Sequence, residues 1–268
     1  MDDAFDLSPG PGPLVAAAVH DGHAVHPETL RHMALPDAER LREEDPFTAR
    51  LTSVAPTRIV GRRSRFEVDL NRPRDRAVYR TPDDAWGLDV WGGEAPAEAV
   101  ERGLGVYDAF YRAVEELLSL KVQEYGSVVV YDLHSYNHRR DGADAAPADP
   151  EANPEVNVGT GSLDRARWGS LVDRFTADLR TGGAAAGLGD LDVRENVKFQ
   201  GGHFSRWVHE TFGSAACVIA VEFKKTFMDE WTGEPDRDHL AKLQTALAST
   251  VDGVLAARAE IEGAPATR

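Results

Sequence analysis

The stretch SVVVYDLH, residues 127–134, places a run of apolar residues directly before an aspartate and a histidine. Two other runs have the same form: LVAAAV at 14–19 precedes His20, and CVIAV at 217–221 precedes Glu222. Nearly continuous apolar runs of this length suit strands that are buried on both faces, as in a parallel sheet covered by helices. Open α/β sheets bind ligands at the carboxyl ends of their strands, so we expect His20, His134 and Glu222 at one site.

The segments between these runs indicate helices. Apolar residues recur at helical spacing over 95–124, over 163–180 and over about 237–261. The stretch FEVDL at 66–70 alternates as a half-buried strand does, and TGGAAAGLGDL at 181–191 has the composition of a flexible connector. Strands that alternate with helices predict an α/β fold with three αβα layers and a mostly parallel or mixed central sheet.

A chain of 268 residues is long enough for one large domain, and we interpret residues 1–268 as a single catalytic domain. Residues 1–13 are acidic and then rich in Gly and Pro, which predicts a flexible N-terminal segment. The polar, Pro-rich stretch 139–158 predicts a long loop, of the kind that forms lids over substrate sites. We expect residues 262–268 to form a frayed tail.

Charge and cysteine content narrow the function classes. The net charge of −15 disfavours binding to nucleic acid or to anionic membranes. No stretch approaches the roughly 20 apolar residues of a membrane helix, and no secretory signal is present, which predicts a cytoplasmic protein. The single cysteine excludes a disulfide and a thiolate metal cluster within one chain. Eight arginines crowd residues 58–80, and a subset of them is suited to bind a small anion through guanidinium–carboxylate pairing.

The sequence HDGH, residues 20–23, offers two imidazoles three residues apart, and Gly22 permits a tight turn between them. Two nearby ligands and a distant third, with one position left for water, form the pattern of a catalytic zinc site. We therefore predict a Zn²⁺ site, or a site for another divalent metal, at His20, His23 and His134. The alternatives to the second of these ligands are Asp21, His26 and Glu28.

Strand alternation places Asp132 and His134 on the same side of their strand. Asp132 is then suited to accept the second ring N–H of a metal-binding histidine and so fix its tautomer. A Ser-His-Asp triad with Ser135 is the rival interpretation. It is weak, because Ser135 adjoins His134 in sequence and the chain has no G-x-S-x-G motif.

Several motifs carry a family resemblance. The stretch RFEVDLNR at 65–72 contains D-L-N-R, which resembles the motif of the aspartoacylase and succinylglutamate desuccinylase group of zinc hydrolases, whose fold is that of zinc carboxypeptidases. The rest of the chain looks closer to the N-formylglutamate amidohydrolases, and the similarity spans residues 14–230. The supporting motifs are H-x-G at 20–22, D-L-H-S at 132–135, N-x-x-x-x-G-G at 196–202, and the Glu222 strand leading into F-M-D-E at 227–230.

The resemblance implies roles for individual residues. It implies metal ligands at His20 and His134, while His23 stands where that superfamily usually has Glu. Arg65 is implied to steady the scissile carbonyl oxygen, and Glu222 is implied to be the general base. The remaining implied or candidate residues are Asn71 and Arg72 for the substrate carboxylate, His203, Arg206 and Lys224 for a side-chain carboxylate, and Asp69 beside Asp132 as support for the metal ligands.

These features together predict a zinc-dependent amidohydrolase that cleaves an N-acyl acidic amino acid. By resemblance, the favoured reaction converts N-formyl-L-glutamate to formate and L-glutamate, a step in histidine degradation, and the expected partner is a small anionic substrate. One alternative is a carboxypeptidase-like enzyme or another N-acylamino-acid hydrolase. A second alternative is a metal-binding or ligand-binding protein without turnover, against which Glu222 argues, because a binding site has little use for a general base.

Overall fold

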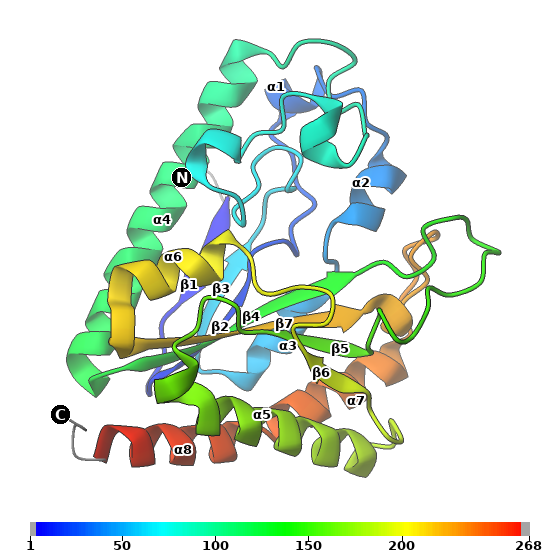
Figure 1. Ribbon diagram of the computed structural model, residues 1–268. Coiled ribbons are helices and arrows are strands. Elements are labelled where there is room, and N and C mark those ends of the chain that lie inside the picture. The colour runs from blue at the N-terminus through cyan, green and yellow to red at the C-terminus, as the bar shows by residue number, and fades with distance from the viewer. Residues whose placement is uncertain (1–3, 264–268) are drawn as a thin grey trace.

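The computed structural model describes residues 4–263. Within them, seven strands form one mixed sheet in the order β1-β3-β2-β4-β7-β5-β6 (Figure 1). The strands are β1 (Phe5–Ser8), β2 (Leu14–Ala18), β3 (Thr57–Gly61), β4 (Val128–Tyr136), β5 (Val156–Gly159), β6 (Val193–Glu195) and β7 (Ala216–Lys224).

The centre of the sheet is parallel and its margins are mixed. Strands β3, β2, β4 and β7 run parallel to one another. Strand β1 pairs antiparallel with β3, and β5 pairs antiparallel with β7 but parallel with β6. The three apolar runs form β2, β4 and β7, and every residue of β2 and β4 is buried. The predicted α/β fold with a mostly parallel or mixed sheet is confirmed.

Helices cover both faces of the sheet (Figure 1). Alternate strand residues face opposite layers: Val15 and Ala17 pack with α4 (Ala97–Tyr125) and α6 (His203–Phe212). Leu14 and Ala16 belong to the core beneath α5 (Arg165–Ala185), α7 (Arg237–Ala248) and α8 (Val251–Gly263). The short helices are α1 (Pro27–Leu30), α2 (Asp37–Glu43) and α3 (Thr48–Leu51), and the 3₁₀ turns are η1 (Thr52–Val54), η2 (Arg74–Arg76), η3 (Pro82–Ala85), η4 (Gly213–Ala215) and η5 (Lys225–Phe227).

The helix predicted over 95–124 is confirmed as α4, but two other helix predictions need correction. The last helix is broken, because the hydroxyls of Ser249 and Thr250 bond to the backbone carbonyls of Ala246 and Leu247 and compete with helix continuation. Helix α5 continues through Gly182 and Gly183 and ends at Ala185, so only the second part of the predicted connector, residues 186–191, lies outside the helix. At Gly182 a Cβ would meet the side chain of Ser249, so this glycine allows the close approach of α5 to the α7–α8 junction.

The strand predicted at 66–70 does not exist. Backbone N–H groups of Glu67 and Val68 bond to the carbonyl of Ser64 and fold the segment into turns. The alternating apolar residues Phe66, Val68 and Leu70 are nonetheless all buried. The pattern therefore identified the buried apolar residues, but the segment is neither a strand nor half-buried, because Glu67 and Asp69 are buried as well.

The structure also tests the three predictions about flexible segments and loops. Residues 5–8 form the edge strand β1, so residues 1–13 are not a flexible segment throughout; residues 1–3 lie outside the described range. The long loop after β4 ends where β5 begins at Val156, so the last three residues of the predicted loop 139–158 belong to a strand. In the tail predicted at 262–268, α8 includes residues 262 and 263, and residues 264–268 lie outside the described range. No helix among residues 4–263 is long and apolar enough to cross a membrane.

Candidate active site

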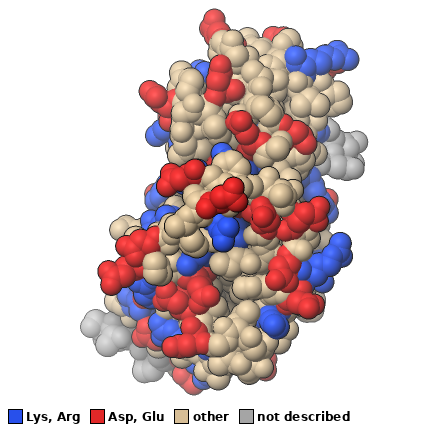
Figure 2. Space-filling view, turned by 90° about the vertical axis from the view of Figure 1, so that its right-hand side faces the viewer, with Lys and Arg blue, Asp and Glu red and all other residues tan. Residues whose placement is uncertain are grey.

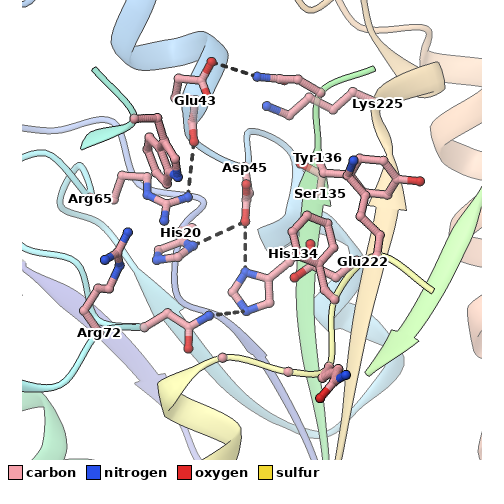
Figure 3. Close-up of a pocket in the computed structure, with 18 of the residues that line it drawn as sticks. His20, Glu43, Asp45, Arg65, Arg72, His134, Ser135, Tyr136, Glu222 and Lys225 are labelled. Carbon is pink, nitrogen blue, oxygen red and sulfur yellow. Dashed lines mark hydrogen bonds and ion pairs between the residues drawn. The ribbon is translucent and has the colours of Figure 1, made fainter. Parts of the chain in front are cut away.

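The carboxyl ends of the central parallel strands bring three distant segments together (Figure 3). His20 follows β2, and His134 lies near the end of β4. Glu222 lies on β7 directly beside His134 in the strand register. The fourth residue, Asp45, lies between α2 and α3, and its backbone N–H donates to the carbonyl of His20 over 2.9 Å.

His20, Asp45 and His134 form a buried cluster. Each residue offers one potential ligand atom, a ring nitrogen or a carboxylate oxygen, and these three atoms lie within 4.8 Å of one another. Asp45 Oδ2 is 2.9 Å from His134 Nδ1 and 3.5 Å from His20 Nδ1. Both imidazoles thus turn the same ring nitrogen toward one carboxylate.

The other ring nitrogen of each histidine meets a buried carboxylate. His20 Nε2 lies 2.6 Å from Asp69 Oδ1, and His134 Nε2 lies 2.9 Å from Asp132 Oδ1. The hydroxyl of Ser205 donates to the second oxygen of Asp132 over 2.8 Å. With a metal bound, these carboxylates would keep the proton of each imidazole on Nε2, so that each Nδ1 would be free to act as a ligand.

This donor set fits a divalent metal. Two imidazoles and a carboxylate are the three protein ligands of many catalytic zinc sites, with a fourth position left open. Histidines whose second nitrogen bonds to a carboxylate are the usual arrangement around such ions. The residues present would therefore hold a metal ion, whose identity the donor types leave open among the first-row metals.

His23 does not belong to this cluster, which corrects the expected ligand set. Its Nδ1 lies 2.5 Å from Glu44 Oε2, and its Nε2 lies 3.2 Å from Asp37 Oδ1. The three alternatives lie elsewhere too: Asp21 accepts the N–H of Ala49, His26 caps α1, and Glu28 pairs with Arg31.

Asp45 occupies the place expected for His23, and sequence reasoning missed it. It lies 25 residues after His20, at the end of the acidic triplet EED at 43–45. No local spacing connects it to His20. The Pro that follows at position 46 is the one local signal, because it marks the end of a helix and hence a loop.

A cavity of about 380 Å³ opens beside the cluster, and His20, Asp45, His134 and Glu222 line it. Arg65, Asn71 and Arg72 line it as well. Three N–H groups of Arg65 donate, to Asp69, to Tyr79 Oη and to the Glu43 carbonyl. Guanidinium has five N–H donors, so two remain for a ligand.

Three candidates for a side-chain carboxylate do not line this cavity, namely His203, Arg206 and Lys224. His203 Nε2 instead lies 3.0 Å from Tyr107 Oη, and Arg206 donates to the carbonyl of Gly201. The cations that sequence reasoning missed are Arg140, Lys198 and Lys225. Of these, Lys198 lies inside the quoted N-x-x-x-x-G-G segment, which was the available signal.

Comparison with known proteins now decides the family. The family model described as N-formylglutamate amidohydrolase matches residues 12–228, well over half of the chain. The chain belongs to this family. A search of curated proteins gave no match.

Two solved structures are similar to this N-formylglutamate amidohydrolase family member over nearly their whole length. An N-formylglutamate amidohydrolase from Ralstonia eutropha JMP134 has a TM-score of 0.71 at 19% identity, covering 97% of this chain and 99% of that chain. A gene product from Agrobacterium tumefaciens has a TM-score of 0.61 at 16% identity, covering 97% and 96%. At these identities the similarity shows the fold alone. The resemblance to zinc carboxypeptidases, which the sequence motifs suggested, remains a prediction.

In this member of the family, the surroundings of the site shift the pKa values of two carboxyl groups, Glu222 and Asp45, in opposite directions. Burial raises the pKa of Glu222 to about 7, although His134 opposes the shift. Burial would also raise the pKa of Asp45, but hydrogen bonds with His134 and His20 hold it well below its usual value. The carboxyl of Glu222 has no hydrogen bond or ion pair within residues 4–263. Asp45 is thus a fixed anion, whereas Glu222 is free to exchange a proton.

Proposed function

We propose that this protein hydrolyses the amide bond of N-formyl-L-glutamate to formate and L-glutamate, with zinc or another divalent metal held by His20, Asp45 and His134. The family membership supports the reaction class. The strongest support from the site is that three metal-type donors and the unpaired Glu222 carboxylate line one cavity. We place this reaction in cytoplasmic histidine degradation, following the family resemblance.

A divalent cation held by His20, Asp45 and His134 would supply Lewis-acid chemistry, because such an ion acidifies bound water and polarises a carbonyl group. Glu222 accepts a proton from the attacking water and returns it to the amide nitrogen as the C–N bond breaks. In the absence of a metal ion, burial raises the pKa of this carboxyl group to about 7, so Glu222 is suited to gain and lose a proton near neutral pH.

The cations of the cavity orient the substrate and stabilise charge. The two spare N–H groups of Arg65 are suited to the oxygen that becomes negative as water adds to the formyl carbon. Arg72 lines the same side of the cavity and is suited to the α-carboxylate. Asn71 is already engaged, since its Oδ1 accepts the N–H of Phe204 and its Nδ2 lies 3.3 Å from His134 Nε2. We therefore assign Asn71 to positioning the loop before α6 as well as to the substrate.

Formate release from N-formyl-L-glutamate tests the proposal, measured with purified protein before and after chelation and metal readdition. We expect metal-dependent release by the wild type. Glu222→Gln should lower kcat by about 10²- to 10⁴-fold with unchanged metal content, since it removes the proton carrier and no metal donor. The matched control is Glu210→Gln, at an exposed position on α6 outside the cavity.

Each alternative has its own result in this assay. Metal-loaded protein that releases no formate would sink the formylglutamate assignment, and other acylated amino acids and short peptides would then identify a carboxypeptidase-like or different N-acylamino-acid hydrolase. A protein that binds metal but turns over none of them would be a binding protein, and Glu222→Gln would change nothing measurable.

A further inference from the structure

Lys198 is an exposed lysine that lines the cavity and forms no ion pair within the described residues. Its Nζ donates to Asn153 Oδ1 over 2.6 Å and lies 5.2 Å from the centre of the Tyr136 ring. No carboxylate lies within ion-pair distance of Lys198 in the described residues. By contrast, Arg65 pairs with Asp69 at 2.9 Å. A cavity lysine without a counter-charge favours a ligand that brings a negative charge.

Arg140 also lines the cavity, but its guanidinium is already paired with a carboxylate. Its Nη2 lies 3.1 Å from Glu43 Oε2, so a carboxylate already neutralises part of its charge. Burial lowers the pKa of Lys198, and the positive charge of Arg140 lowers it further, while Glu222 opposes the shift. Both cations line the same cavity. An anion between them would relieve this repulsion.

Tyr136, whose ring centre lies 5.2 Å from Lys198 Nζ, is on the far side of the His20–Asp45–His134 cluster from Arg65 and Arg72 (Figure 3). The α-carbon of an N-formyl amino acid carries three diverging arms, which are the formamide, the α-carboxylate and the side chain. With the formamide at the cluster and the α-carboxylate on the arginine side, the side chain extends toward Lys198.

We propose that Lys198 binds the side-chain carboxylate of the substrate and sets the preference for an acidic amino acid. This inference rests on the proposed function and replaces the earlier candidates His203, Arg206 and Lys224, which lie outside the cavity. Lys198 is therefore a specificity residue, and it takes no part in the proton transfers.

The test compares N-formyl-L-glutamate with N-formyl-L-glutamine, a nearly isosteric substrate whose side chain is neutral. Lys198→Met should lower kcat/KM for the glutamate substrate about 10- to 100-fold, the range for losing a charged hydrogen bond. The value for the glutamine substrate should stay within about threefold. Lys242→Met, at an exposed lysine on α7, is the matched control.

Three results would overturn the assignment: an unchanged glutamate preference in Lys198→Met, an equal loss on both substrates, or loss of the preference in Lys224→Met instead. Failure of the proposed function has a different signature, because the wild type would then cleave neither substrate. In that case, calorimetric binding of glutarate against butyrate is the readout. Preference for glutarate that disappears in Lys198→Met supports the second anion site, and equal binding of the two acids by the wild type rejects it.

Discussion

The two histidines of the cluster show how buried carboxylates prepare an imidazole for metal binding. Asp69 and Asp132 each bond to an Nε2 and are themselves fully buried. Because Asp69 also accepts bonds from Arg65 and Tyr79, its negative charge is held in place and its pKa lies well below the usual value, despite its burial. The tautomer of His20 is therefore set by residues that do not themselves contact the metal site.

Metal content should distinguish Asp45 from His23. Asp45→Asn removes a charged donor from the cluster, so we expect metal content to fall from about one ion per chain to nearly none after dialysis. His23→Gln removes contacts to Glu44 and Asp37 and should leave metal content unchanged. Elemental analysis of the two variants checks this. Loss of metal in His23→Gln but not in Asp45→Asn would restore the ligand set expected from the sequence.

His209 should make stability depend on pH. Its Nε2 accepts the N–H of Val218 over 2.9 Å, so the proton resides on Nδ1, beside Ser162 Oγ at 2.8 Å. Burial lowers its pKa to about 4, against about 6.5 in the unfolded chain. The neutral ring is therefore fully stabilising above pH 6.5, and its contribution is lost as the pH falls toward 4, because the unfolded state binds the proton first.

Urea denaturation of the wild type and of His209→Gln at pH 7.5 and pH 5.0 measures this contribution. We expect the stability difference between them to shrink by about 1–2 kcal/mol at the lower pH, after allowance for the partial exposure of the ring. A difference that stays constant or grows on acidification would show that His209 is protonated in the folded state.

Residues of the site were predictable where a strand carried them. His20, His134 and Glu222 follow or end apolar runs, and the parallel strand order brings them to one edge. Asp45 was not predictable in this way, because a loop between two short helices carries it. Its position depends on long-range contacts, such as the bond from Lys225 Nζ to the carbonyl of Glu44 over 2.6 Å. Neither periodicity nor local residue spacing can predict a contact between residues so far apart in the sequence.

At the scale of elements, helix α4 supports the segment that carries Arg65, Asp69 and Arg72. A Cβ at Gly103 of α4 would lie 2.8 Å from the carbonyl oxygen of Glu67, which belongs to that segment. The segment is folded into turns in place of the predicted strand, so its carbonyl groups come close to the helix. Sequence alternation identified its buried residues, whereas the turn itself depends on local bonds to Ser64 that alternation cannot report.

Two glycines of α4 provide a matched pair for this contact. Gly103→Ala should destabilise the protein by about 1–3 kcal/mol, because its Cβ would force the backbone of Glu67 away. A Cβ at Gly105 would meet nothing within 4 Å, so Gly105→Ala should stabilise by about 0.5–1 kcal/mol through helix propensity. Chemical denaturation of both variants checks the signs. Equal effects would show that α4 does not pack closely on the segment.

At the scale of the whole molecule, charge is distributed unevenly. The chain has a net charge of −15, and acidic side chains are spread over the face in Figure 2. The cavity lining has the opposite balance, with more cations than acids. The cations are Arg65, Arg72, Arg140, Lys198 and Lys225, and the acids are Glu43, Asp45 and Glu222. A cationic cavity in an acidic protein selects small anions that can enter it and does little to attract extended polyanions.

The metal site should also stabilise the whole fold. Its three donors lie after β2, between α2 and α3, and on β4, so one ion would join segments more than 100 residues apart in the chain. Binding to the folded state alone adds about 4 kcal/mol at a free metal concentration 1,000 times the Kd. Without metal, the bonds of Asp45 to His134 and His20 offset part of that loss.

We therefore expect chelation to lower the melting temperature of the wild type by roughly 5–10 °C. Readdition of zinc should restore it. Asp45→Asn should melt at one temperature under both conditions, because it lacks the donor that links the two histidines. Calorimetric scans at a fixed rate measure these temperatures. A wild type that binds metal yet melts identically with and without it would show that the three segments hold their positions by packing alone, and that the ion serves only the chemistry of the cavity.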